Sequence, residues 1–229
     1  MKAFRVIAGV VLGVFMSGAV FAGTAGDNPG ARLMDGNKRF VEGKLATKDI
    51  GDNRRNELSK GQHPFAIVLT CSDSRVAPEL LFDQGLGDVF VIRVAGNVVD
   101  DITLGSIEYA AEHLHAPLLL ILGHQSCGAV KAALGATGEP EGNIGAILKK
   151  IMPAAEKAKA AGRKDEAETL DMAVQENIKD VYADVMAKSP VIKELAEGGK
   201  LKVMMGEYYL DSGRVKVMEA AEEKQNAKE

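Results

Sequence analysis

The sequence contains no tryptophan, only two cysteines and no excess of positive charge. Its 28 basic and 32 acidic side chains give a net charge of −4, and no segment forms a basic stripe. This balance argues against a nucleic-acid-binding protein. The sequence also lacks internal repeats, low-complexity tracts and a Walker-type phosphate loop, and the last of these absences argues against nucleotide binding. The composition is that of a soluble globular protein.

The first 22 residues have the features of a secretory signal peptide. Lys2 and Arg5 give a positive start, residues 6–20 form an apolar run, and Val20-Phe21-Ala22 offers a small-residue cleavage site. An uncleaved membrane anchor is the alternative, but the apolar run is slightly short for a membrane span. We therefore expect cleavage and export, to the periplasm in a bacterium. Contact with a membrane is then expected only through the signal peptide during export.

Cleavage after residue 22 leaves 207 of the 229 residues and changes the net charge from −4 to −6, because two basic residues are lost. A chain of this length can bury one good core, so residues 23–229 are expected to form a single domain. The charged stretch 220–229 is interpreted as a solvated tail.

Export makes a disulfide the first alternative for the two cysteines, because an even cysteine count in an exported chain usually indicates one. Their sequence context favours a metal site. Cys71 opens Cys-Ser-Asp-Ser-Arg, so Asp73 and Arg75 follow it, and His124 precedes Cys127 by three residues. Two thiolates and one imidazole suit zinc and leave a fourth position open.

Short apolar runs predict the strands of an α/β fold. Three runs are continuous rather than alternating, as in strands that are buried on both faces of a parallel sheet. We expect strands at 65–70, 89–94 and 117–122, a fourth from 202 toward 208, and a fifth, antiparallel strand at 214–218. Helical periodicity lies between them, at 31–42, 101–114, 126–134, 143–161 and 165–188. The prediction is a mainly parallel sheet of four to five strands flanked by helices, with an N-terminal helical arm.

The zinc-binding residue types fall at the edge of this predicted sheet where ligands bind. Cys71 and His124 are placed just past the carboxyl ends of strands, and Cys127 in the first turn of the next helix. The helix dipole is expected to lower the pKa of the Cys127 thiol. Gly123 and Gly128 are expected to let the backbone turn tightly around a metal.

These motifs together resemble the β-class carbonic anhydrases. The resemblance rests on Cys71-Ser-Asp-Ser-Arg75 and Gly123-His-Gln-Ser-Cys-Gly-Ala129, supported by 33–40, 83–88, 93–98 and 106–110. It implies a zinc enzyme that hydrates carbon dioxide reversibly to bicarbonate and a proton through zinc-bound hydroxide, with one Zn²⁺ per subunit. It also implies a homodimer or a dimer of dimers.

Carried over residue by residue, the resemblance makes Cys71, His124 and Cys127 the zinc ligands. Asp73 and Arg75 match the catalytic pair, in which the arginine holds the aspartate off the metal, and in a closed state the aspartate becomes the fourth ligand. Three further residues match the substrate pocket: Gln62 across a subunit boundary, Phe90 as an apolar wall, and Gly128 as a backbone N–H donor.

One departure from the family concerns a second, inhibitory bicarbonate pocket, which some bacterial members build from a tryptophan, an arginine and a tyrosine. Arg93 matches the arginine, and Tyr208 or Tyr209 the tyrosine, but Val68 stands at the tryptophan position. Inactivation by bicarbonate is therefore not expected. The other histidines, His63, His113 and His115, are interpreted as surface residues.

Two alternative functions stay open at this stage. The same zinc set can serve a carbonyl sulfide or carbon disulfide hydrolase of the same fold. A non-catalytic exported zinc or thiol protein is the other alternative, although metal storage needs neither Asp73 nor Arg75.

Overall fold

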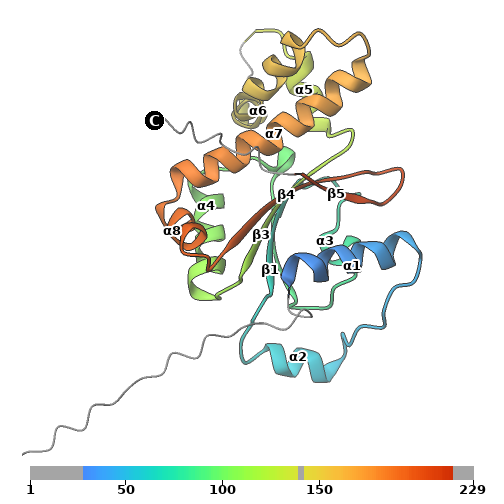
Figure 1. Cartoon of the computed structure of the whole chain (residues 1–229), viewed down its shortest axis with the longest axis vertical. Helices are drawn as coiled ribbons and strands as arrows, with labels where there is room; N and C mark the ends of the chain where they lie inside the picture. The colour runs from blue at the N-terminus through green and yellow to red at the C-terminus, as the bar shows by residue number, and fades with distance from the viewer. Residues whose placement is uncertain (1–27, 139–141, 219–229) are drawn as a thin grey trace, which may run out of the picture.

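The computed structural model describes residues 28–138 and 142–218 (Figure 1). The predicted signal peptide and the charged tail beyond residue 218 lie outside this range, so both stay predictions. Among the described residues, no helix is long and apolar enough to cross a membrane.

A five-stranded sheet in the order β2-β1-β3-β4-β5 forms the centre of the fold. Its strands are β1 (Ala66–Thr70), β2 (Val89–Arg93), β3 (Leu118–His124), β4 (Lys202–Tyr208) and β5 (Val215–Met218). The first four run parallel, and β5 pairs antiparallel with β4. β1 and β3 are buried at every position, as their continuous apolar sequences predict for inner strands. β2 was expected to be buried in the same way, but it is an edge strand and only partly buried. The predicted fold class is confirmed.

Helices cover both faces of the sheet (Figure 1). One face packs against α4 (Asp101–Glu108), α5 (Gly128–Gly135), α6 (Gly142–Ala160), α7 (Glu166–Lys188) and α8 (Pro190–Glu197). α4 continues into a π-helical turn, η2 (Tyr109–His113). The opposite face packs against α1 (Pro29–Val41) and α3 (Pro78–Leu81), which contribute Leu33 and Leu81 to a second apolar cluster. Each fully buried leucine or isoleucine in these clusters stabilises the fold by about 2 kcal/mol.

Each predicted strand and helix is present, with ends shifted by a few residues. The predicted helix at 101–114 corresponds to α4 followed by η2. Three short helices were not predicted: α2 (Asp52–Leu58), α3 and α8. α8 begins where the Ser189 hydroxyl accepts a hydrogen bond from the Ile192 N–H at 3.1 Å, a capping contact that ends α7 and starts a new helix.

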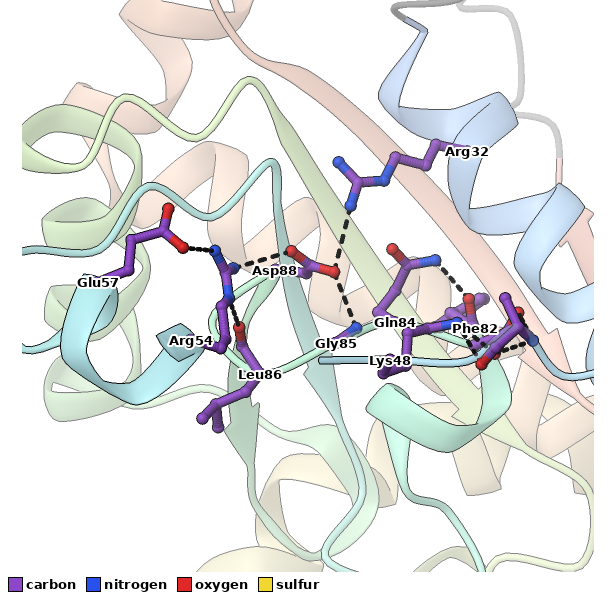
Figure 2. A network of polar contacts seen from close by, with 11 residues as sticks. Arg32, Lys48, Arg54, Glu57, Phe82, Gln84, Gly85, Leu86 and Asp88 are labelled. Atoms are coloured by element: carbon purple, nitrogen blue, oxygen red, sulfur yellow. Dashed lines mark hydrogen bonds and ion pairs between the residues drawn. The ribbon is translucent and has the colours of Figure 1, made fainter. Parts of the chain in front are cut away.

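A polar network fastens the N-terminal helices to the loop before β2 (Figure 2). The carboxylate of Asp88 accepts from the Gly85 N–H at 2.8 Å and forms ion pairs with Arg32 of α1 at 3.2 Å and Arg54 of α2 at 3.3 Å. Arg54 also donates to the carbonyl oxygen of Leu86 at 3.0 Å. α1, which was predicted, and α2, which was not, are therefore held on one loop by a single carboxylate.

Candidate active site

The side chains of Cys71, His124 and Cys127 meet at the carboxyl ends of β1 and β3. One ligand atom from each lies within 4.8 Å of the other two, and all three residues are buried. His124 is the last residue of β3 rather than a residue after it. Residues 56 positions apart in the sequence thus converge because β1 and β3 are parallel neighbours, which brings their carboxyl ends to the same edge.

The turn from β3 into α5 is made differently from the prediction. Cys127 is the N-cap of α5, and the helix begins at Gly128. The left-handed residue in this turn is Ser126, with φ 56°, and not a glycine. Gly123 is needed for another reason, because a Cβ there would lie 2.6 Å from the side chain of Ile178, where α7 packs on β3.

His124 presents a free nitrogen to the centre of the cluster. Its Nδ1 lies 2.9 Å from the carbonyl oxygen of Gln125, which can only accept, so Nδ1 carries the proton. Its Nε2 is buried without a hydrogen-bond partner. A buried acceptor with no donor is costly in an apolar surrounding, and a cation at this position would satisfy it.

The two cysteines are both free, with their Sγ atoms 4.0 Å apart. The pKa of the Cys71 thiol is lowered, first by its hydrogen bond with Cys127 and also by the Gly96 N–H, which donates to its Sγ at 3.2 Å. The pKa of Cys127 is raised by the hydrogen bond with Cys71 and by burial. The expected lowering was wrong for this thiol, because the contributions of the Ala129 and Val130 amides are outweighed.

This donor set fits a zinc ion. Two adjacent thiols cannot both ionise without a nearby cation, so in the metal-free protein the two sulfurs share one proton. A divalent cation would remove that restriction and would also bind the unpartnered His124 nitrogen. Two thiolates and one imidazole are three of the four ligands that zinc prefers.

Asp73 is turned toward Arg75 in the structure. Its Oδ1 accepts from Arg75 Nε at 2.9 Å and from the Arg75 backbone N–H at 3.0 Å, and its Oδ2 accepts from Arg75 Nη2 at 2.7 Å. These hydrogen bonds hold the pKa of the Asp73 carboxyl well below its usual range, so it is ionised. Its Oδ2 lies 3.8 Å from His124 Nε2, which places the carboxylate beside the free nitrogen.

The three residues predicted for the substrate pocket are not all near this centre. Phe90 packs at the border of the apolar cluster that contains Cys71 and Cys127. Gly128 is exposed, and a Cβ there would meet nothing within 4 Å. Gln62 is exposed and lines a surface hollow with Leu58 and Leu86, away from the cysteines. Its predicted role across a subunit boundary stays a prediction.

Two residues close to the cysteines were missed by the sequence reasoning. Gly96, in the short helical turn η1 (Ala95–Asn97) after β2, adopts φ 69°, and a Cβ there would lie 2.6 Å from the side chain of Ile151. Asn177 of α7 is buried and donates to the Gly96 carbonyl oxygen at 2.9 Å, which steadies the residue whose N–H contacts Cys71. The position of η1 at the carboxyl end of β2 was the available signal for Gly96.

The residues that match the family's inhibitory pocket are buried or make other contacts in this structure. Val68 is fully buried in the second apolar cluster, and Arg93 donates to backbone carbonyl groups. Tyr208 is buried, and the Tyr209 hydroxyl donates to Glu207 at 3.2 Å. His63, His113 and His115 are exposed, as expected of surface residues.

Comparison with known proteins places this site in a family. The family model described as carbonic anhydrase matches residues 66–215. Carbonic anhydrase 2 of Mycobacterium tuberculosis is 42% identical over 185 residues, which cover 80% of this chain and 87% of that protein. The carbonic anhydrase of Mycolicibacterium smegmatis is 42% identical over 188 residues, covering 81% and 89% of the two chains.

Solved structures give the class within the family. A β-carbonic anhydrase of Coccomyxa, solved in complex with acetazolamide, has a TM-score of 0.67 at 28% identity, covering 81% of this chain and 84% of that one. One of two β-carbonic anhydrases from Sordaria macrospora, described as tetrameric, has a TM-score of 0.66 at 29% identity, covering 72% and 86%. The chain therefore belongs to the β class of the carbonic anhydrases, a family of lyases.

Proposed function

We propose that this enzyme hydrates carbon dioxide reversibly to bicarbonate and a proton, with one zinc ion per subunit held by Cys71, His124 and Cys127. The observation that carries the proposal is the buried, unpartnered Nε2 of His124 between two thiols, with the Asp73 carboxylate 3.8 Å away. A metal store would need the three ligands, but it would not need an ionised carboxylate held beside them by Arg75.

Zinc, when bound, lowers the pKa of a coordinated water toward neutrality and so makes a nucleophile available near pH 7. The protein's residues supply orientation through hydrogen bonds. Asp73 is an acceptor beside the open position, and Arg75 keeps it ionised and turned aside. His124 is oriented by its Nδ1–H bond to Gln125. Phe90 and Gly128 are proposed to border the position of the small, apolar substrate.

Stopped-flow hydration of carbon dioxide by the zinc-loaded protein tests this function. We expect carbon dioxide hydration to require zinc. Turnover of carbonyl sulfide or carbon disulfide by the same protein should be far slower than turnover of carbon dioxide. Hydrolysis of the sulfur compounds without hydration of carbon dioxide would assign the alternative hydrolase. Stoichiometric zinc with no turnover on any of the three would leave a zinc or thiol protein.

Metal-free protein is expected to oxidise. The Cys71 and Cys127 sulfurs are 4.0 Å apart, and a disulfide needs about 2.05 Å, so a small movement lets oxygen take two electrons and two protons from the pair. We expect a thiol count after air exposure to fall from two to none in the metal-free protein, with zinc no longer taken up. The zinc-loaded protein serves as the control and should keep both thiols. Two persistently free thiols in the metal-free sample would contradict the expectation.

We further propose that the enzyme is a homodimer or a dimer of dimers, with Gln62 reaching the site of a partner subunit. Support comes from the Sordaria macrospora relatives described as tetrameric. Several large apolar side chains are also exposed in the single chain, among them Leu80 at 61% and Ile102 at 81%. Sedimentation equilibrium on the zinc-loaded protein would distinguish two from four subunits, and a monomer would refute this proposal.

Export to the periplasm is proposed from residues 1–22 alone. Sequencing the N-terminus of protein recovered from a bacterial periplasmic fraction tests it, with Gly23 as the expected first residue. Intact Met1 in the soluble fraction of the cytoplasm would refute it.

A further inference from the structure

We infer that Arg93 is a positioning residue, which holds the turn after β1 so that Asp73 stays on Arg75 and off the zinc position. The inference rests on the proposed zinc site. Arg93 lies on β2 and contacts the backbone of the turn after β1, not the side chains of the zinc ligands or of Asp73. Arg93 is the last residue of β2 and is paired in register with Thr70, the last residue of β1.

The Arg93 side chain crosses from β2 to the backbone of the turn that carries Cys71 and Asp73. Its Nε donates to the carbonyl oxygen of Cys71 at 3.1 Å, and its Nη2 donates to that of Asp73 at 2.5 Å. One planar guanidinium therefore bridges two carbonyl groups two residues apart. Because the guanidinium fork is rigid, the spacing and direction of both carbonyl groups are fixed together.

The turn itself lies outside any helix or strand, so it depends on such contacts. Its own backbone bond runs from the Val76 N–H to the Asp73 carbonyl oxygen at 3.0 Å, and the buried Val76 side chain anchors its far end in the core. The Asp73–Arg75 hydrogen bonds are internal to the turn. They fix the carboxylate relative to Arg75, but not relative to the ligands. The hydrogen bonds from Arg93 fix the position of the turn relative to the sheet, which also holds Thr70 and His124.

Loss of these bonds should let the turn rotate. Asp73 Oδ2 already lies 3.8 Å from His124 Nε2, so a modest rotation of the turn would bring the carboxylate onto a metal bound to that nitrogen. Arg93 then controls which of two partners Asp73 has, the guanidinium of Arg75 or the metal. This is a role for the side chain in geometry, and it needs neither contact with substrate nor a change in ionisation.

Arg93→Met tests the inference, because methionine keeps much of the apolar stem and removes both donors. With zinc bound, we expect kcat to fall by about 10- to 100-fold, the usual range when a residue supporting the ligands is lost, with KM nearly unchanged. Arg93→Lys restores one donor and should recover part of kcat. Arg163→Met is the matched control, since Arg163 is exposed in the loop between α6 and α7.

A spectroscopic readout separates positioning from a general loss of structure. In cobalt-substituted Arg93→Met, we expect the visible bands to shift to those of a site with a carboxylate bound. Adding Asp73→Asn should remove that shift, because the carboxylate is then absent. An unchanged cobalt spectrum together with reduced kcat, or a shift that persists in the double variant, would overturn the inference. If the parent protein has no carbon dioxide hydration, the proposed function fails, while the cobalt spectra still decide the role of Arg93.

Discussion

Cys71→Ser is expected to leave the protein without zinc and without carbon dioxide hydration. The Cys71 sulfur is buried beside Cys127, and the Gly96 N–H and Cys127 both favour its thiolate form. A serine hydroxyl does not ionise in this pH range and is a hard oxygen donor, so the soft, anionic ligand is lost. Zinc per subunit, measured by atomic emission after dialysis, should fall from one to near zero.

The control for this substitution is Ser74→Ala, because Ser74 is exposed in the same turn. That variant should keep its zinc. Circular dichroism of Cys71→Ser should show the parent's helix and strand content, since the apolar clusters on both sheet faces do not depend on the cysteine alone. A folded Cys71→Ser variant with one tightly bound zinc per subunit would refute the ligand assignment.

Asp73→Asn is expected to keep zinc and lose most of the turnover. Asparagine has nearly the same shape, but it is uncharged, so it cannot hold the ion pair with Arg75 or act as an anionic hydrogen-bond acceptor beside the metal position. Removing one positioned hydrogen-bonding group from an active site typically costs roughly 10²- to 10³-fold in kcat. We expect a fall of about 100-fold or more in stopped-flow hydration, with zinc content unchanged.

Arg75→Ala reaches a similar result by the opposite route. Asp73 keeps its charge and the hydrogen bond from the backbone N–H of residue 75, but it loses both hydrogen bonds from the guanidinium. The carboxylate is then free to coordinate the metal and block the open position. The two variants should therefore differ in cobalt spectrum, with a bound carboxylate only in Arg75→Ala. Full hydration activity in either one would contradict the assignment of this pair.

The sheet was the most predictable part of the fold. Three predicted strands are continuous apolar runs, which are typical of strands covered on both faces, and β1 and β3 are such strands. The same expectation was wrong for β2, which lies at the edge of the sheet and is only partly buried. β3 continues two residues beyond its predicted end because Gly123 and His124 still pair with β4. The short helices α2, α3 and α8 were missed because segments of four to eight residues carry little periodicity.

The ligand types were also predictable, whereas the ionisation of the thiols was not. A helix terminus after Cys127 indicated a lowered pKa, but the pKa of this thiol is raised because the Cys71 sulfur lies 4.0 Å away. The carboxyl of Glu207 is a second group whose ionisation depends on tertiary contacts. Burial, and then the charge of Asp171, raises its pKa to about 7, although the two residues are far apart in the sequence.

By itself, the sequence determined which residues can bind a metal and that parallel strands would carry them to one edge. Those conclusions depend on residue chemistry and on local patterns, which a linear chain displays. Only the tertiary structure decided that Asp73 faces Arg75, that His124 Nε2 is left unpartnered, and that Arg93 and Asn177 support the site from other elements. Those features depend on distances between segments up to 81 residues apart, and packing of the helices on the sheet sets such distances.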